Sequence, residues 1–195
     1  MIEELINKNR SYRRFYQEHE VSKEQLLKLA DFARLSPSPR NLQALKFWLS
    51  NNEQLNEQIF PNLAWAGYLK NWAGPKKGER PAAYIFIAGD KSFSPDFQKD
   101  FLPTASGIVA QSVLLGAVEM GLGGCIIAAF QKNKLAEIIS LPDNLEIMLV
   151  LAIGKPKEMI ILDELNNESD IKYWRDEKEA HHVPKRRLED ISKML

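Results

Sequence analysis

Three short, almost wholly apolar runs constrain the fold of this chain more than any other feature. They cover residues 82–88, 125–130 and 147–153. A strand of this composition must be covered on both faces by other elements, because it has no polar face to present to water. Helical patterns separate the runs, and the runs are too few for a full doubly wound sheet. The pattern therefore predicts an α+β layered fold.

The clearest helix is predicted at residues 21–35, where apolar side chains repeat at helical spacing and form one face. Ser22 suits the N-cap position, and Gln25 three residues later completes a capping box. Pro37 disfavours the helical conformation at the residue before it and so ends the helix. The same patterns predict shorter helices at 2–7, 52–59 and 132–139 and a short strand at 47–49.

A second long helix is predicted at residues 103–120 and is unusually rich in small side chains. Small residues permit close helix packing, so we expect this helix deep in the fold or at a contact between subunits. Gly121 is the expected left-handed stop. Gln111, Glu119 and several glycines interrupt the apolar stretch 108–130. This stretch therefore indicates a buried helix and strand rather than a membrane span.

The 195 residues fit one domain with a genuine core, because domains cluster near about 100–150 residues. Within this single domain, 1–195, we expect a core at 1–162 and a C-terminal arm at 163–195. Charged residues are frequent in the arm, and its apolar residues show little periodicity. Such a segment cannot bury enough surface to offset a backbone entropy cost of about 1–2 kcal/mol per residue. It must therefore pack on its own domain or on a partner subunit.

Charge and residue types argue against several functional classes. The 26 basic side chains balance 26 acidic ones, which argues against nucleic-acid binding. The single cysteine, Cys125, lies in an apolar stretch and is expected to be buried rather than nucleophilic. His19, His181 and His182 lack metal-ligand spacing, so we expect solvated histidines and no metal site. The N-terminus lacks the pattern of a signal peptide, and we expect a cytoplasmic protein.

No catalytic side chain is predicted from the motifs. The chain has no nucleophile elbow, no P-loop and no HExxH motif, and no pair of carboxylates stands out from the charged background. If the protein is an enzyme, a bound cofactor supplies the chemistry.

Two basic segments lie near opposite ends of the chain. Arg10, Ser11 and Arg13 follow the first helix, and arginines beside a hydroxyl can hold a phosphate through charge-assisted hydrogen bonds. Lys185 and Arg187 form the second segment. Each segment has a simpler interpretation, because a short basic cluster is often only a solvated turn or face.

Two further segments carry groups able to contact a flat ligand. Residues 36–43 form a stiff polar loop that either reads the edge of a heterocycle or is only a capped turn. Residues 121–130 are rich in glycine and small side chains, which let the backbone approach a planar ligand. Their glycine spacing does not match a dinucleotide fingerprint. The candidate residues in these two segments are Pro37, Ser38, Asn41, Gln43, Ile127, Ala128 and Ala129.

Taken together and in this order, the four segments resemble the nitroreductase family of FMN-dependent oxidoreductases. The matching patterns are R-S-x-R-x-F at 10–15, P-S-x-x-N-x-Q at 37–43, G-L-G at 121–123 and P-K-x-R at 184–187. Three positions depart from patterns frequent in the family. Asn9 stands for the first of two arginines, Ala44-Leu45 for Pro-Trp, and Ala128-Ala129 for Glu-Gly.

The resemblance implies a nitroreductase-like fold and one shared cofactor site. The implied fold has a mostly antiparallel central sheet flanked by helices, with the C-terminal arm extending onto the partner subunit. In a homodimer, the loop at 37–43 would cover FMN from the other subunit. The resemblance also implies that the FMN phosphate is bound by Arg10, Ser11, Lys185 and Arg187. Arg13 would contact the ribityl chain or the N1/O2 side of the ring. The ring itself would lie against Ile127, Ala128 and Ala129.

The activity implied by the resemblance is oxidation of NADH or NADPH by the bound FMN. Hydride would then pass by a ping-pong mechanism to a quinone, a nitroaromatic or a similar electron-poor small molecule. An alternative is a flavin-binding sensor or storage protein with little turnover. The sequence is also compatible with a relative that dehalogenates aromatics or breaks down flavin, and with a ligand-free dimerisation domain. Trp65, Tyr68 and Trp72 are either a lid over the flavin or part of a packed surface loop.

Overall fold

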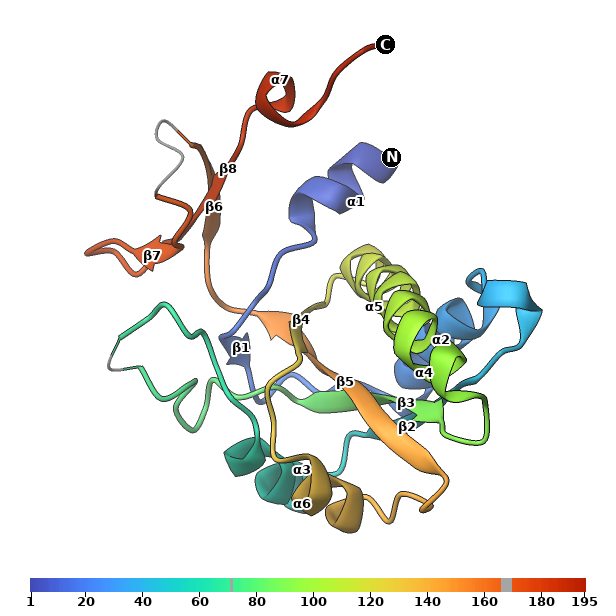
Figure 1. Cartoon of the computed structure of the whole chain (residues 1–195). Coiled ribbons are helices and arrows are strands. Elements are labelled where there is room, and N and C mark those ends of the chain that lie inside the picture. The colour runs from blue at the N-terminus through green and yellow to red at the C-terminus, as the bar shows by residue number, and fades with distance from the viewer. Residues whose placement is uncertain (71, 166–169) are drawn as a thin grey trace.

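One five-stranded antiparallel sheet lies at the centre of the computed structural model, which describes residues 1–70, 72–165 and 170–195 (Figure 1). Its longest strand is β5 (Leu145–Pro156). This strand pairs with three others, which are β3 (Ala83–Asp90), β4 (Gly123–Ile127) and β1 (Phe15–Tyr16). The fifth strand, β2 (Leu45–Ser50), pairs with β3. The α+β fold class and the mostly antiparallel sheet are confirmed.

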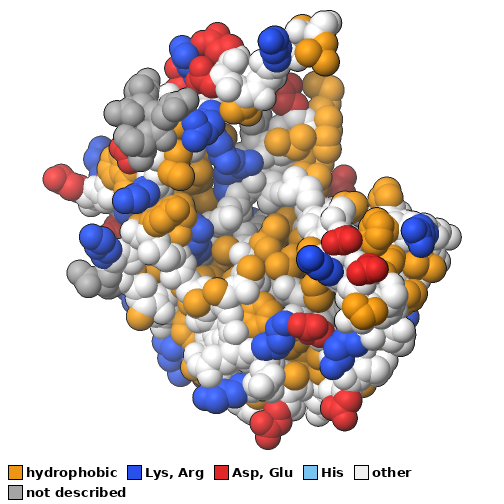
Figure 2. All heavy atoms as spheres, viewed as in Figure 1, with side chains coloured by type: hydrophobic (Ala, Val, Ile, Leu, Met, Phe, Trp, Pro, Cys, Tyr) orange, Lys and Arg blue, Asp and Glu red, His pale blue; other side chains and the backbone are white. Residues whose placement is uncertain are grey.

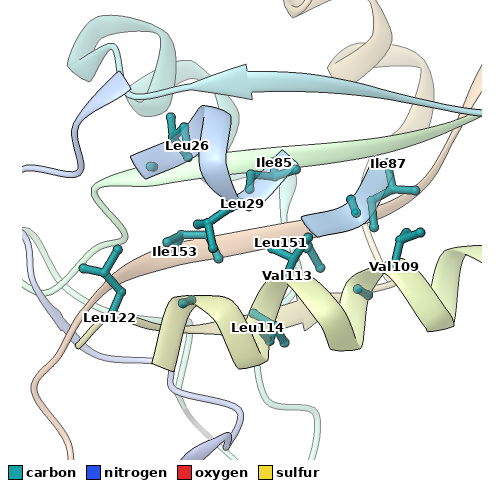
Figure 3. Close-up of a cluster of buried hydrophobic side chains, with 14 of the residues drawn as sticks. Leu26, Leu29, Ile85, Ile87, Val109, Val113, Leu114, Leu122, Leu151 and Ile153 are labelled. Atoms are coloured by element: carbon teal, nitrogen blue, oxygen red, sulfur yellow. The ribbon is translucent and has the colours of Figure 1, made fainter. Parts of the chain in front are cut away.

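Helices cover both faces of the sheet, as the apolar runs predict (Figure 1). One face carries α2 (Lys23–Leu35) and α5 (Leu102–Glu119), and the other carries α3 (Glu53–Ile59) and α6 (Lys132–Ile138). Alternate residues of β3 enter the two cores. Ile85 and Ile87 pack with α2 and α5 (Figure 3), whereas Tyr84 and Phe86 pack with α3 and α6.

Helix α5 lies close against α2, and a glycine makes this approach possible. A Cβ atom on Gly116 would lie 2.3 Å from Cδ2 of Phe32 in α2, which is too close for a side chain. The expected depth of this small-residue helix is therefore confirmed. Gly121 ends the helical segment with a φ of 71°, the left-handed stop that the sequence predicts.

The span Pro95–Glu119, which joins α4 (Pro95–Asp100) to α5, is long and apolar enough to cross a membrane by length and composition alone. Half of the apolar 18-residue stretch within this span is buried inside the chain. Its buried side chains pack on the sheet and on α2. The span therefore has the packing of a core helix.

Several boundaries of strands and helices differ from the sequence prediction, because the backbone of a segment changes its pairing partner along the chain. The strand expected at 125–130 is β4, which begins at Gly123 and ends at Ile127. Beyond it the chain leaves β5 and pairs with a loop instead, since the Ala64 N–H donates to the Ala129 carbonyl over 2.9 Å. Before the C-terminal segment, the short elements that the sequence does not predict are β1, α4, η1 (Pro39–Asn41) and η2 (Phe60–Asn62).

The C-terminal segment forms regular structure on its own chain. Strand β8 (His181–Lys185) pairs in parallel with β6 (Ile160–Glu164) and antiparallel with β7 (Trp174–Arg175). A short helix, α7 (Leu188–Ile191), follows. The segment therefore packs on its own chain through β6, which is one of the two arrangements that the sequence predicts; its extension onto a partner subunit stays a prediction. Strand β6 also runs across the position where we place the start of the arm.

Helix α1 (Ile2–Lys8) precedes the basic segment and lies against α5. The Asn9 amide donates to the Gln111 Oε1 over 3.2 Å and joins the end of α1 to α5. In Figure 1, α1 lies on the same side of the sheet as α5. This contact fixes where the chain enters the basic segment at residues 10–15.

The capping box of α2 generates a stability prediction. The Ser22 Oγ accepts from the Gln25 N–H, and the Gln25 side chain accepts from the Ser22 N–H, so both ends of the box are present. We expect Ser22→Ala to lower the free energy of unfolding by about 0.5–2 kcal/mol, because it removes a cap acceptor. Ser22→Asn, which keeps an acceptor, is the control. Equal losses in urea denaturation of both variants would contradict this role.

Candidate functional site

The basic segment at residues 10–15 lies on the edge of β4. Ser11 forms a parallel bridge with Gly124, and the Tyr12 N–H donates to the Gly124 carbonyl over 3.0 Å. A Cβ atom on Gly123 would lie 2.6 Å from the Tyr12 ring, so this approach requires glycine. The packing places Ser11 and Arg13 beside the start of β4, close to Cys125.

Arg10 has the capacity to bind an anion. Its Nη2 donates to the Ile6 carbonyl over 2.8 Å, whereas its Nε is buried without a hydrogen-bond partner. Within the described residues, no carboxylate forms an ion pair with Arg10. Ser11, the next residue, has an exposed side chain. A cation with an unsatisfied buried N–H beside an exposed hydroxyl suits a phosphate.

Arg13 is fixed through one of its terminal nitrogens. Its Nη1 lies 3.2 Å from the Ser11 carbonyl oxygen and 3.1 Å from Nε2 of His181. The guanidinium also lies over the Tyr173 ring, 4.6 Å from the ring centroid. Its Nε and Nη2 have no hydrogen-bond partner in the described parts of the chain. These N–H groups therefore remain for a ligand.

A buried carboxylate holds the basic segment to the C-terminal strands. The Glu158 side chain is 1% exposed, accepts from the Arg13 backbone N–H, and accepts from Arg175 Nη2 over 3.0 Å. The Arg175 guanidinium lies 4.4 Å from the centroid of the Trp72 ring. Burial lowers the pKa of Arg175, and the nearby Glu158 charge opposes this shift. The ion pair thus compensates two buried charges.

His181 is completely buried beside these arginines, so the expectation that it is solvated is wrong. Burial, followed by the charges of Arg13 and Arg175, lowers the pKa of His181 to about 4. The imidazole is therefore neutral at neutral pH and can accept a hydrogen bond from Arg13. Its Nδ1 is buried without a partner among the described residues.

His182 faces the other side of β8 and is also not solvated. It stacks on Trp174 with ring centroids 4.1 Å apart, and its Nδ1 lies 2.9 Å from Asp163 Oδ2. The side chain is 15% exposed. The two adjacent histidine side chains therefore lie on opposite sides of β8, and His181 is the one that contacts Arg13.

The predicted ring-facing residues lie at the end of β4. Ile127 is buried, whereas the side chains of Ala128 and Ala129 are exposed. The backbone here lies beside the loop that carries Trp65, which is 9% exposed and packs in the core next to Phe60. Trp65 therefore belongs to a packed loop rather than to a free lid.

The predicted phosphate ligands near the C-terminus are not joined to Arg10 by any direct contact among the described residues. Lys185 is exposed at the end of β8, and Arg187 forms ion pairs with Glu189 at 2.9 Å and Asp190 at 3.1 Å. Figure 2 shows Lys and Arg side chains gathered over the C-terminal strands, beside a hollow that separates these strands from the body of the chain. Over the part of the chain that the structure describes, the N-terminal basic segment and β8 meet through Arg13 and His181.

The polar loop forms a second group, separate from the first. Asn41 and Gln43 adopt left-handed conformations with φ of 54° and 50°, and Ser38 Oγ accepts from the Gln43 N–H over 2.9 Å. Pro37, Ser38 and Gln43 line a hollow of about 500 Å³ between α2, β2 and α5. In Figure 1 this loop, which follows α2, lies at the opposite end of the sheet from β1. One chain therefore does not unite all predicted site residues.

The first group has the chemistry that FMN requires. Arg10 carries an unpartnered buried N–H for an anion, and Arg13 carries free N–H groups for the acceptor atoms of a planar ring. Past the other end of β4, Ala128 and Ala129 present only small, exposed side chains. These residues fit one phosphate-bearing flavin, and the loop at 37–43 fits it only if a second chain supplies it.

Four residues of this group are absent from the sequence prediction: Glu158, Tyr173, Arg175 and His181. Their contacts depend on β7 and β8 folding back onto residues 13 and 14, which no local pattern shows. One local signal was present, because the aromatic residues at 173–174 and the β-branched Val183 are of types that strands favour.

The sequence model of the nitroreductase family matches residues 6–155. An oxygen-insensitive NADPH nitroreductase of Helicobacter acinonychis is 26% identical over 180 residues, covering 78% of this chain and 86% of that protein. A solved nitroreductase family protein of Clostridium novyi NT is 26% identical, with a TM-score of 0.66 over 80% of this chain and 86% of that one. An FMN-dependent nitroreductase of Clostridium difficile R20291 is 24% identical, with a TM-score of 0.64 over 87% of this chain and 94% of that one, and shares the fold.

The buried neutral imidazole of His181 generates a pH prediction. Between its ordinary value of 6.5 and about 4, the unfolded histidine binds a proton and the folded one does not. The free energy of unfolding therefore decreases as the pH falls through this window. We expect a shallower decrease for His181→Gln, which lacks the titrating group.

Urea denaturation across this pH window measures the difference. His19→Gln is the matched control, because His19 is exposed, and it should follow the wild-type slope. Identical slopes for the wild type and His181→Gln would show that His181 is not held neutral by the fold.

Proposed function

Because the chain belongs to the nitroreductase family, we propose that it is an FMN-dependent oxidoreductase that takes hydride from NADH or NADPH. It delivers reducing equivalents to a small electron-poor acceptor such as a quinone or a nitroaromatic. The observation that carries this proposal is Arg13, whose fixed guanidinium keeps free N–H groups beside the start of β4. The named NADPH activity of the Helicobacter acinonychis relative and the FMN dependence of the Clostridium difficile relative support it.

FMN, when bound, supplies the hydride-accepting and hydride-donating chemistry. Arg10 and Ser11 would bind its phosphate together with Lys185 and Arg187, since a dianion requires several donors. Arg13 would place positive charge at the N1/O2 side of the ring and stabilise negative charge there. No side-chain acid or base is assigned, and the protein residues bind and orient.

The segment after β4 would contact the ring from its other edge. The backbone at Ile127, Ala128 and Ala129 would face the N5 side, and the small side chains would leave room for a flat donor or acceptor. Ala128-Ala129 in place of Glu-Gly removes a carboxylate from this position, so only backbone groups would act there.

We further propose a cytoplasmic homodimer in which each FMN site is shared. The loop carrying Pro37, Ser38, Asn41 and Gln43 would reach the cofactor bound mainly by the partner. Two observations support this arrangement: within one chain the loop lies at the opposite end of the sheet from β1, and α5 exposes Ile108 and Gln111 on its outer face. A second copy packed on that face would complete both sites.

Reconstitution tests the proposed activity. We expect the protein to bind FMN with a yellow flavin spectrum, and to consume NADH or NADPH continuously when a quinone is present. Anaerobic titration with each nicotinamide would show which one reduces the flavin. A protein that stays colourless with FMN contradicts the proposal, whereas a single slow reduction without turnover would identify a flavin-binding sensor or store.

Mixing of inactive chains tests the shared site. Arg10→Glu disables the first group, and the double variant Asn41→Ala with Gln43→Ala disables the loop. A mixed dimer then contains one site with all the changes and one with none, so random re-association should restore about a quarter of wild-type turnover. Mixing Arg10→Glu with Arg13→Gln is the control, because both changes lie in the same group and no site is left intact. Recovery in the control, or none in the test pair, would refute the sharing.

A further inference from the structure

Arg13 is held by contacts that leave one side of its guanidinium free. The nitrogen Nη1 faces two acceptors, the Ser11 carbonyl at 3.2 Å and His181 Nε2 at 3.1 Å. The Tyr173 ring covers one face of the guanidinium at 4.6 Å, and Glu158 binds the Arg13 backbone N–H. With Nη1 engaged twice, the orientation of the planar group is set, and Nε and Nη2 remain without a hydrogen-bond partner among the described residues.

His181 is the one side chain among these contacts that hydrogen-bonds to the Arg13 guanidinium, and it is itself fixed. Its side chain is completely buried in β8, which pairs with β6 and β7. The His181 and Tyr173 rings lie 5.2 Å apart, so both side chains that contact the Arg13 guanidinium come from the C-terminal segment. The C-terminal segment therefore fixes the orientation of a residue in the N-terminal segment.

The hydrogen bond requires a neutral imidazole with an unprotonated Nε2. The charged groups around His181 are mainly cationic: Arg13, Arg14 and Arg175. The Glu158 carboxylate is already bound to Arg175 and to the Arg13 backbone. A protonated His181 would place a second cation 3.1 Å from the guanidinium and would lose the acceptor. The surrounding cations therefore favour the neutral imidazole, whose Nε2 accepts the hydrogen bond.

We propose that His181 is a positioning residue for the flavin site: its Nε2 accepts from Arg13 Nη1 and thereby aims the Arg13 Nε and Nη2 N–H groups at the N1/O2 side of FMN. This inference rests on the proposed function, because it assigns a role toward the same cofactor. It adds a residue outside the four segments that resemble the family, and it makes β8 part of the site through His181 as well as through Lys185.

The first test compares FMN affinity in variants of two neighbouring histidines. His181→Leu removes the acceptor, and we expect FMN to bind about tenfold more weakly or worse, as for loss of a hydrogen bond to a charged group. His181→Gln places an amide oxygen near the position of Nε2 and should restore most of the affinity. His182→Gln is the matched control, since His182 lies on the same strand and contacts Trp174 and Asp163. It should leave FMN affinity unchanged.

A double-mutant cycle separates positioning from a general structural role. If His181 acts through Arg13, then His181→Leu should weaken FMN binding in the wild type but have no further effect in an Arg13→Gln background. The flavin midpoint potential should follow the same pattern. Equal, additive losses in both backgrounds would overturn the proposal.

A third measurement needs neither FMN nor a variant. Nitrogen NMR of the imidazole in the FMN-free wild type should show Nδ1 protonated and Nε2 unprotonated at neutral pH; the opposite tautomer would overturn the proposal.

Wild-type protein that fails to bind FMN refutes the proposed function and this inference together. Wild-type protein that binds FMN as tightly as His181→Leu refutes this inference alone.

Discussion

The close packing of the N-terminal segment on the central sheet is the constraint on which the rest of the structure depends. Two glycines permit it. A Cβ atom on Gly123 would collide with Tyr12, and one on Gly154 would lie 2.9 Å from the Phe15 ring. Because β5 pairs with both β4 and β1, this packing brings residues 10–15 to the position where the C-terminal strands begin.

The arrangement explains why a chain with no net charge can hold a cationic site. Arg13 and Arg175 share the buried Glu158, and a neutral histidine accepts from Arg13 instead of adding a further charge. Arg13 and Arg175 are thereby held in the interior, although not every N–H of their guanidinium groups has a hydrogen-bond partner. Arg13 retains free N–H groups, and Arg10 retains a buried one, which are the features that a bound anion requires.

Much of the fold could be predicted from the sequence, because its signals are local. Apolar runs identified strands β3 and β5, and the Ser22–Gln25 capping box identified the start of α2. The family motifs selected Arg10, Ser11 and Arg13 in advance of any geometry. The structure then placed Ser11 and Arg13 together beside β4.

The remainder depends on contacts between distant segments. Strand β8 pairs with β6 and covers Arg13, so the burial of His181 follows from tertiary packing rather than from the charged sequence around it. The loop at 37–43 is a similar case, since its distance from Arg13 is visible only once the sheet is formed.

A crystal structure of the protein with FMN is the most direct test of the shared flavin site. We expect one flavin per chain, with its N1/O2 edge at Arg13 Nε and Nη2, its phosphate at Arg10, and residues 37–43 of a second subunit against the ring. A flavin bound elsewhere, or an Arg13 guanidinium turned away from the ring while His181 still holds it, would contradict this arrangement.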